Sequence, residues 1–120
     1  MEFIYVYGKF SRDQIIYVAR QMHNEIHRLL IYKDINIPNK IFQTDKAFFK
    51  YFNNLLINYG SLNDMFGYPA QMVLFMERLN SAYIEAKKED FNYSLYKKEL
   101  LDAHGLLTEM FGEVRENVNG

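Results

Sequence analysis

The sequence predicts a mainly α-helical fold of about four helices, preceded by one short β-strand. Four stretches place apolar residues at steps of three and four, which is the period of a helix with one buried face. Capping residues or a proline stand at the start of these stretches, and the segment before them is β-branched and aromatic. With 120 residues and no linker or internal repeat, the chain is expected to form a single helical domain over residues 1–120.

The chain is expected to begin with a strand over about residues 3–7 and a helix over about residues 12–32. Every residue of the strand is β-branched or aromatic, and a glycine follows. Ser11 precedes Gln14 by three residues, the spacing of a capping box, in which two side chains satisfy each other's free backbone N–H groups. The apolar stripe of the helix consists of Ile15, Ala19, Met22, Ile26, Leu29 and Leu30.

The second helix is predicted over about residues 45–59. Thr44 is the expected N-cap of this helix. Gly60 is the expected end, because glycine readily takes the left-handed conformation that follows many helices. Phe49 and Tyr51 lie off the apolar stripe, so the stripe alone does not bury them.

The third and fourth helices are predicted over about residues 69–88 and 94–116. Residues 72–76 are apolar on all sides of the third helix, which indicates a segment that is enclosed or serves as an interface. Ser94 is the expected cap of the fourth helix. Gly105 interrupts that helix at a cost of about 1 kcal/mol relative to alanine, so we expect a close neighbour or a bend there.

The composition argues against several classes of protein. Without cysteine the chain can form no disulfide and no zinc–thiolate site, and the cytoplasm is the expected location. Residues 1–60 hold eight Lys and Arg against five Asp and Glu, whereas residues 61–120 hold six against ten. Such a mild imbalance makes nucleic acid an unexpected main ligand. The sequence contains neither a signal-peptide pattern nor an apolar run long enough for a bilayer, so no membrane is expected as a partner.

Aromatic residues make up 17% of the chain, with ten Tyr, ten Phe and no Trp. Each aromatic side chain buries roughly 150–250 Å², so twenty of them exceed what one small core is expected to hold. The aromatic residues predicted to bind a partner are Tyr7, Phe10, Phe49, Tyr51, Tyr68 and Phe75. The alternative interpretation is that tyrosines lie half-exposed around an ordinary core.

The surplus of aromatic residues favours a non-enzymatic protein–protein interaction module, such as a regulator, an inhibitor or a small assembly subunit. The partner is expected to be another protein, and the apolar seam of residues 96–114 or the N-terminal strand offers a route to a homodimer. No motif implies a cofactor. Heavy use of Ile, Asn, Lys, Tyr and Phe fits a low-GC genome, such as that of a Gram-positive bacterium, its phages or its mobile elements.

Arg20 and His27 carry an alternative, catalytic interpretation. Six residues separate the two side chains, and in this spacing the chain resembles the HEPN ribonucleases, which are small helical proteins. The resemblance implies a metal-independent ribonuclease in which Arg20 stabilises phosphate charge and His27 acts as general acid or base at a 2′-hydroxyl. It rests on this pair alone, and in that family the pair lies later in the chain.

His23 and His27 are the weak candidates for a metal site. They stand four residues apart and so share one face of the predicted helix, as histidines of metal-binding helices do. A zinc site needs further ligands, and the spacing identifies none. Two histidines at the border of an apolar stripe are therefore the preferred interpretation, and no metal is expected.

Overall fold

The structure is a computed structural model that describes residues 3–5, 8–34 and 42–116. Four helices occupy most of these residues: α1 (Arg12–Lys33), α2 (Asp45–Met65), α3 (Ala70–Ala86) and α4 (Tyr93–Glu116). The predicted mainly α-helical fold with four helices is thereby confirmed.

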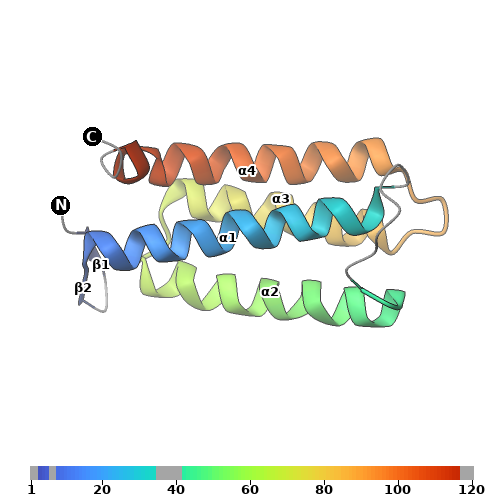
Figure 1. The fold of residues 1–120 in the computed structure, drawn as a ribbon, viewed down its shortest axis with the longest axis horizontal. Coiled ribbons are helices and arrows are strands. Elements are labelled where there is room, and N and C mark those ends of the chain that lie inside the picture. The colour runs from blue at the N-terminus through green and yellow to red at the C-terminus, as the bar shows by residue number, and fades with distance from the viewer. Residues whose placement is uncertain (1–2, 6–7, 35–41, 117–120) are drawn as a thin grey trace.

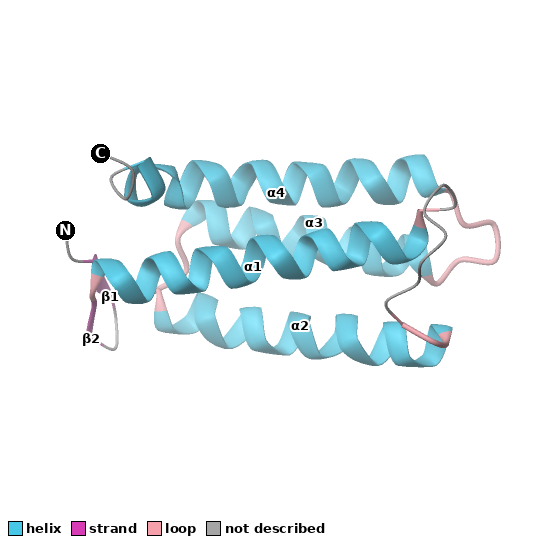
Figure 2. Cartoon of the chain, in the orientation of Figure 1, coloured by secondary structure: helices cyan, strands magenta, loops and turns pink. Residues whose placement is uncertain are grey.

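The four helices lie side by side and alternate in direction along one long axis (Figure 1). α1 packs against α4, α4 packs most closely against α3, and α3 packs against α2. The connecting loops gather at the two ends of the bundle (Figure 2). Within the part of the chain that the structure describes, no helix has the length and apolar character that crossing a membrane requires.

Two three-residue strands precede α1, namely β1 (Phe3–Tyr5) and β2 (Gly8–Phe10). They pair antiparallel, with Phe3 opposite Phe10. The sequence predicted one strand over residues 3–7, and residues 6–7 lie outside the described residues. That single strand is therefore not confirmed.

The starts of α1 and α2 follow the predicted capping chemistry. The Ser11 hydroxyl oxygen accepts a hydrogen bond from the Gln14 backbone N–H at 3.2 Å, and the Ser11 N–H donates to the Gln14 side chain at 2.8 Å. This arrangement is the predicted capping box. Thr44 caps α2, because its hydroxyl oxygen accepts from the Ala47 N–H at 3.1 Å.

The start of α4 differs from the prediction. The Asn92 side-chain oxygen accepts hydrogen bonds from the N–H groups of Ser94 at 2.9 Å and Leu95 at 3.3 Å. Asn92 is therefore the N-cap, and Ser94 lies inside the first turn. Asparagine and serine are both favoured caps, so composition alone did not distinguish the two positions.

The end of α2 also differs from the prediction, because the helix continues through Gly60 to Met65. Gly67 has φ 78° and Tyr68 has φ 59°, so the left-handed turn comes seven residues later than expected. The Gly67 N–H donates to the Asp64 carbonyl at 3.1 Å, which closes the helix end. Leu62 and Phe66 follow the glycine and pack in or against the core, and this packing stabilises the longer helix.

Alanine at Gly60 and at Gly67 should have opposite effects on stability. A Cβ at Gly60 meets nothing within 4 Å, so Gly60→Ala should raise the free energy of unfolding by about 0.5–1 kcal/mol through helix propensity. Gly67→Ala should lower it by about 1 kcal/mol, because an alanine at positive φ is strained. Urea unfolding of the two variants measures both changes, and stabilisation by Gly67→Ala would contradict the assigned helix end.

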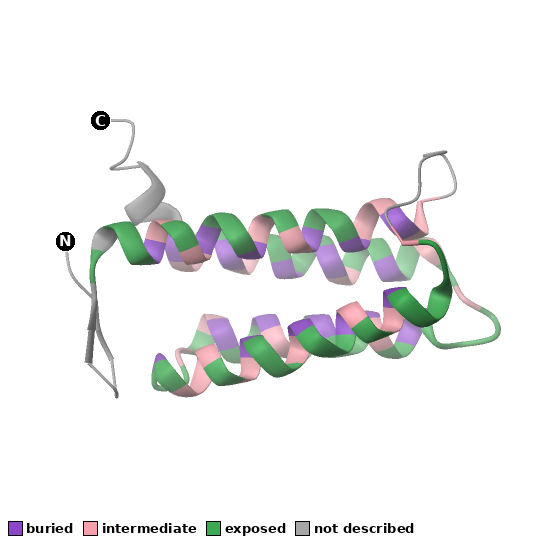
Figure 3. Ribbon diagram, turned by 60° about the horizontal axis from the view of Figure 1, so that its bottom comes forward, coloured by how far each residue is buried: buried purple, intermediate pink, exposed green. Residues whose placement is uncertain are grey.

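The core is a continuous cluster of side chains on the inward faces of the helices (Figure 3). Its largest fully buried members are aromatic: Phe48, Phe52, Tyr59, Phe75, Tyr96 and Phe111. Most of the predicted stripe of α1 is buried with them, since Ile15, Ala19, Met22, Ile26 and Leu29 are all 0–1% exposed. Many of the aromatic side chains are therefore buried in the core of the chain itself.

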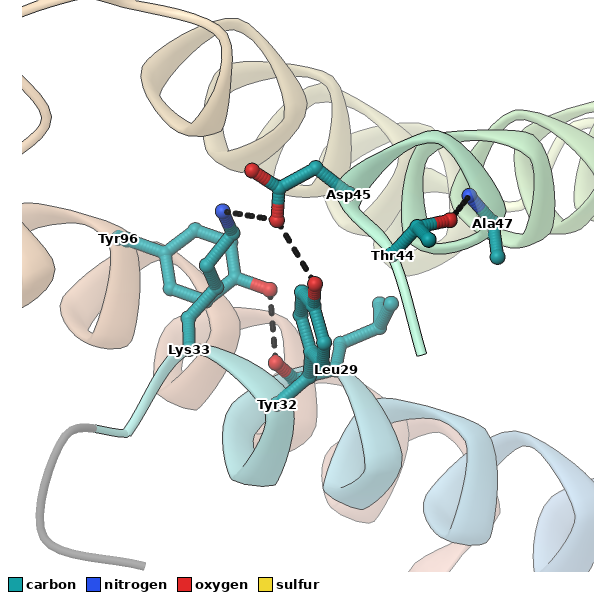
Figure 4. A network of polar contacts seen from close by, with 7 residues as sticks. All are labelled: Leu29, Tyr32, Lys33, Thr44, Asp45, Ala47 and Tyr96. Atoms are coloured by element: carbon teal, nitrogen blue, oxygen red, sulfur yellow. Dashed lines mark hydrogen bonds and ion pairs between the residues drawn. The ribbon is translucent and has the colours of Figure 1, made fainter. Parts of the chain in front are cut away.

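Polar contacts join α1 to α2 at one end of the bundle (Figure 4). The Tyr32 hydroxyl donates to Asp45 Oδ1 at 2.7 Å, and Lys33 Nζ lies 3.7 Å from the same oxygen. Lys33 Nζ also lies 5.1–5.5 Å from four aromatic ring centroids, including those of Phe48 and Phe91, within the range of cation–π attraction. The ammonium group of Lys33 therefore lies among aromatic rings at this end of the bundle.

Two buried tyrosines tie neighbouring helices together through their hydroxyl groups. The Tyr96 hydroxyl on α4 donates to the Leu29 carbonyl of α1 at 2.8 Å. The Tyr59 hydroxyl on α2 donates to Glu25 Oε1 of α1 at 2.7 Å. Because a buried hydroxyl needs a partner, these bonds fix where each tyrosine can lie in the core.

Candidate functional site

The predicted aromatic contact residues do not form one surface. Phe75 is fully buried, so it differs from the prediction and cannot reach a partner while the bundle is closed. Phe49 and Tyr51 are half-buried and pack against the core, whereas Tyr68 is 59% exposed. Tyr7 and the side chain of Phe10 lie outside the described part of the molecule.

The apolar seam predicted within residues 96–114 faces the interior of the same chain. Tyr96, Leu100, Ala103 and Leu107 are each 0% exposed. They pack against α3 and α1 and are not available to a second copy. The predicted apolar stripe is present on α4, but the helices that cover it belong to the same bundle.

Arg20 and His27 are both exposed on α1. They lie about two turns apart, which places them about 10 Å from each other along the helix axis. His27 lines a pocket with His23 and His104, and Arg20 is not among the residues of that pocket. The pocket that the described part of the chain forms around His27 therefore does not include Arg20.

His23 contacts a histidine that the sequence analysis did not pair with it. Its Nδ1 atom lies 2.7 Å from Nε2 of His104, on α4. These two residues and His27, which are all three histidines of the sequence, line a pocket of about 410 Å³ between α1 and α4. Among the described residues, no group of three or more His, Cys, Asp or Glu side chains is placed to hold a metal ion.

The outer side of the α3–α4 pair carries a shallow groove of about 440 Å³. We call it the α3–α4 groove, and its lining consists of Leu74 and Arg78 from α3 and Leu101, Asp102, Gly105, Leu106 and Glu109 from α4. Leu74 is 43% exposed and Leu101 is 48% exposed. Two large apolar side chains, one from each helix, thus lie open to solvent in one concave surface.

Gly105 lies in this groove and has no structural partner that would require a glycine. A Cβ built on it meets no atom within 4 Å. Of the two alternatives expected at Gly105, a close neighbour or a bend, the close approach of a helix of the same chain is therefore not found. A mid-helix glycine costs about 1 kcal/mol relative to alanine, and nothing within the described residues offsets that cost.

The charges of the groove leave an excess of carboxylates. Arg78 Nη1 lies 3.3 Å from Glu99 Oε2, so the cation of the groove is paired within the chain. Asp102 and Glu109 form no ion pair with any residue that the structure describes. The uncompensated charge beside Leu74 and Leu101 is negative.

Further exposed apolar residues lie near the loop that joins α3 to α4. A second depression of about 290 Å³ there includes Ile84 and Leu95, which are 54% and 51% exposed. Its lining includes Glu99, the partner of Arg78, so the ion pair separates the two depressions. Exposed apolar residues therefore recur along the length of the α3–α4 pair.

The sequence did not predict the groove, although two features of the sequence belong to it. The apolar segment of residues 72–76 contains Leu74, which the buried stripe of α3 leaves outside. Gly105 lowers the stability of α4 relative to an alanine at that position. What the sequence could not supply was the adjacency of these two positions across the α3–α4 pair.

Comparison of the chain with protein-family models, with curated proteins and with solved structures finds no match in any of the three.

Proposed function

We propose that this protein is a binding module that holds a basic amphipathic helix of another protein in the α3–α4 groove. The observation that carries the proposal is the exposure of Leu74 and Leu101 on the two sides of one groove. Helix-in-groove recognition uses apolar side chains of this kind as anchoring contacts.

The open backbone at Gly105 supports a helical occupant. Small residues let two helix backbones approach closely, and the position of the missing Cβ is empty. The cost of a glycine inside α4 then has a function, because the groove stays open where a partner backbone would cross.

The charge of the groove supports a basic occupant. Lysine or arginine side chains beside the apolar stripe of the partner would meet the carboxylates of Asp102 and Glu109. Such pairs at the rim of an interface mainly raise the association rate and the specificity, and salt weakens them. Binding should therefore weaken as ionic strength rises.

Two model peptides test this proposal. Both are short amphipathic helices with the same leucine spacing, and one carries lysine and the other glutamate on the polar face. We expect the lysine peptide to bind, with NMR chemical-shift changes centred on Leu74, Leu101 and Gly105. Leu101→Glu should weaken its binding by at least about tenfold, equivalent to about 1.4 kcal/mol.

The matched control is Ile57→Glu, because Ile57 is 60% exposed on α2 and does not line the groove. This variant should bind the lysine peptide as the parent chain does. Equal binding of the two peptides, or equal weakening by Ile57→Glu and Leu101→Glu, would contradict the proposal.

Gly105→Ala separates the fold from the binding. The added methyl group should stabilise the folded chain by about 0.5–1 kcal/mol while narrowing the groove. A variant that is more stable and binds the lysine peptide less tightly supports a close helix approach at Gly105. Unchanged or tighter binding would show that no partner backbone lies there.

A further inference from the structure

His23 on α1 and His104 on α4 meet through their ring nitrogens. Nδ1 of His23 lies 2.7 Å from Nε2 of His104. The two ring centroids are 4.3 Å apart, and the ring planes stand at 76°.

The nitrogens do not point directly at each other. Each ring nitrogen lies about 1.1 Å from its centroid, so a straight N–H···N bond of this length would place the centroids about 5 Å apart. The observed 4.3 Å is clearly shorter. At least one of the two rings is therefore inclined to the line that joins the nitrogens, as in a bent hydrogen bond or in two ligands of one metal ion.

Two ligands at a right angle on one metal ion reproduce both distances. With metal–nitrogen bonds of about 2.0 Å, such ligands hold their nitrogens about 2.8 Å apart and their ring centroids about 4.5 Å apart. A tetrahedral Zn²⁺ ion would require about 3.3 Å and about 5.1 Å. The pair therefore fits square-planar or tetragonal coordination better than tetrahedral coordination.

We infer that His23 and His104 form a two-histidine site for a divalent transition-metal ion of square-planar or tetragonal preference, Cu²⁺ or Ni²⁺. Imidazole suits both ions, and Cu²⁺ is the divalent ion that such ligands bind most tightly. The chain supplies no cysteine that could compete for the metal. The ion would join α1 to α4 across the pocket.

The pocket leaves room for the remaining ligands of the ion. It has a volume of about 410 Å³ and is open to solvent, so water can occupy the other coordination positions. No third side chain among the described residues completes the site. His27 lines the same pocket one turn from His23, which makes it the natural control for an unspecific histidine effect.

Titration of the full chain with Cu²⁺ tests the inference, followed by electron paramagnetic resonance. The expected result is one Cu²⁺ per chain, with coupling to two ring nitrogens. His23→Ala and His104→Ala should each weaken binding by at least about tenfold, whereas His27→Ala should change it by less than about twofold. Mg²⁺, which prefers oxygen ligands, should not bind at this pair.

Circular dichroism of each variant shows whether it is folded, and His104→Asn is the second variant if alanine is not tolerated. Coupling to a single nitrogen, or a loss of binding in His27→Ala as large as in His104→Ala, would overturn the two-histidine site. Tighter binding of Zn²⁺ than of Cu²⁺ would overturn the assigned coordination geometry.

Discussion

Replacement of Phe75 by alanine is expected to lower the free energy of unfolding by about 3–5 kcal/mol. The Phe75 side chain is 0% exposed, and its ring centroid lies 5.4 Å from that of Tyr59 on the neighbouring helix α2. Removing the ring would take away buried apolar surface and leave a cavity that rigid helices only partly fill. Urea unfolding followed by circular dichroism measures the loss.

Tyr68→Ala is the matched control, because among the predicted contact residues whose side chains the structure describes, Tyr68 is the most exposed. Its hydroxyl donates to Asp64 Oδ1 at 2.5 Å within the same turn, and the substitution should cost less than about 1 kcal/mol. If Phe75→Ala costs no more than Tyr68→Ala, the placement of Phe75 in the core is incorrect. The pair thus separates a buried aromatic residue that holds the fold from one whose side chain is exposed.

Alkaline pH is expected to unfold the protein, because its buried tyrosines resist ionisation. Burial, followed by the hydrogen bond to Asp45 and the charge of that carboxylate, raises the pKa of Tyr32 to about 12. Burial likewise raises the pKa of Tyr59 and of Tyr96. In each case the folded state holds the phenol proton more tightly than the unfolded chain does.

The direction of the pH effect follows from these pKa values. An unfolded tyrosine ionises near pH 10, so the contribution of Tyr32 is complete below about pH 10 and is lost as the pH rises to about 12. For Tyr32 alone the loss amounts to about 3 kcal/mol, since each pKa unit corresponds to about 1.4 kcal/mol. Tyr59 and Tyr96 act in the same direction, so the free energy of unfolding should fall steeply above about pH 10.

Urea unfolding at about pH 9 and about pH 11 measures this effect in the parent chain and in Tyr32→Phe. The variant loses the hydrogen bond to Asp45, worth about 1 kcal/mol at neutral pH, but its stability should depend less on pH. Tyr17→Phe is the control, because Tyr17 is 64% exposed. A pH dependence in Tyr32→Phe equal to that of the parent would show that Tyr32 does not contribute.

Local sequence patterns predicted the helices well because their causes are local. The Ser11 and Thr44 side chains cap the turns that immediately follow them, and the stripe of α1 follows from a spacing of three and four. Gly60 misled the prediction of the end of α2, since a glycine permits a helix end without requiring one. The burial of Phe66 depends on α4, through its contact with Phe111, and so lies beyond any local pattern.

The assignment of Phe75 shows a different limit. In a segment that is apolar on all sides, periodicity does not reveal which side faces the core, and the structure selects Met72, Phe75 and Leu79. Leu74 is left outside as a consequence. The orientation of α3 that buries Phe75, which the sequence predicted as a contact residue, therefore also exposes Leu74 in the α3–α4 groove.

The candidate sites depend on which helices are neighbours, and no local pattern carries that information. His23 and His104 are separated by 81 positions in the sequence and meet only because α1 lies beside α4. The α3–α4 groove likewise forms only because Leu74 of α3 lies beside Leu101 and Gly105 of α4. Four amphipathic helices can pack in several arrangements that satisfy the same local sequence patterns equally well.

α1 packs against α4, the helix that is synthesised last of the four. During translation the apolar stripe of α1 therefore emerges long before the surface that will cover most of it, and closing this long loop carries an entropic cost. α3 and α4, joined by a short loop, can pair without such a delay. We therefore expect the α3–α4 pair to form before α1 is covered, so that the apolar stripe of α1 stays exposed longest on the nascent chain.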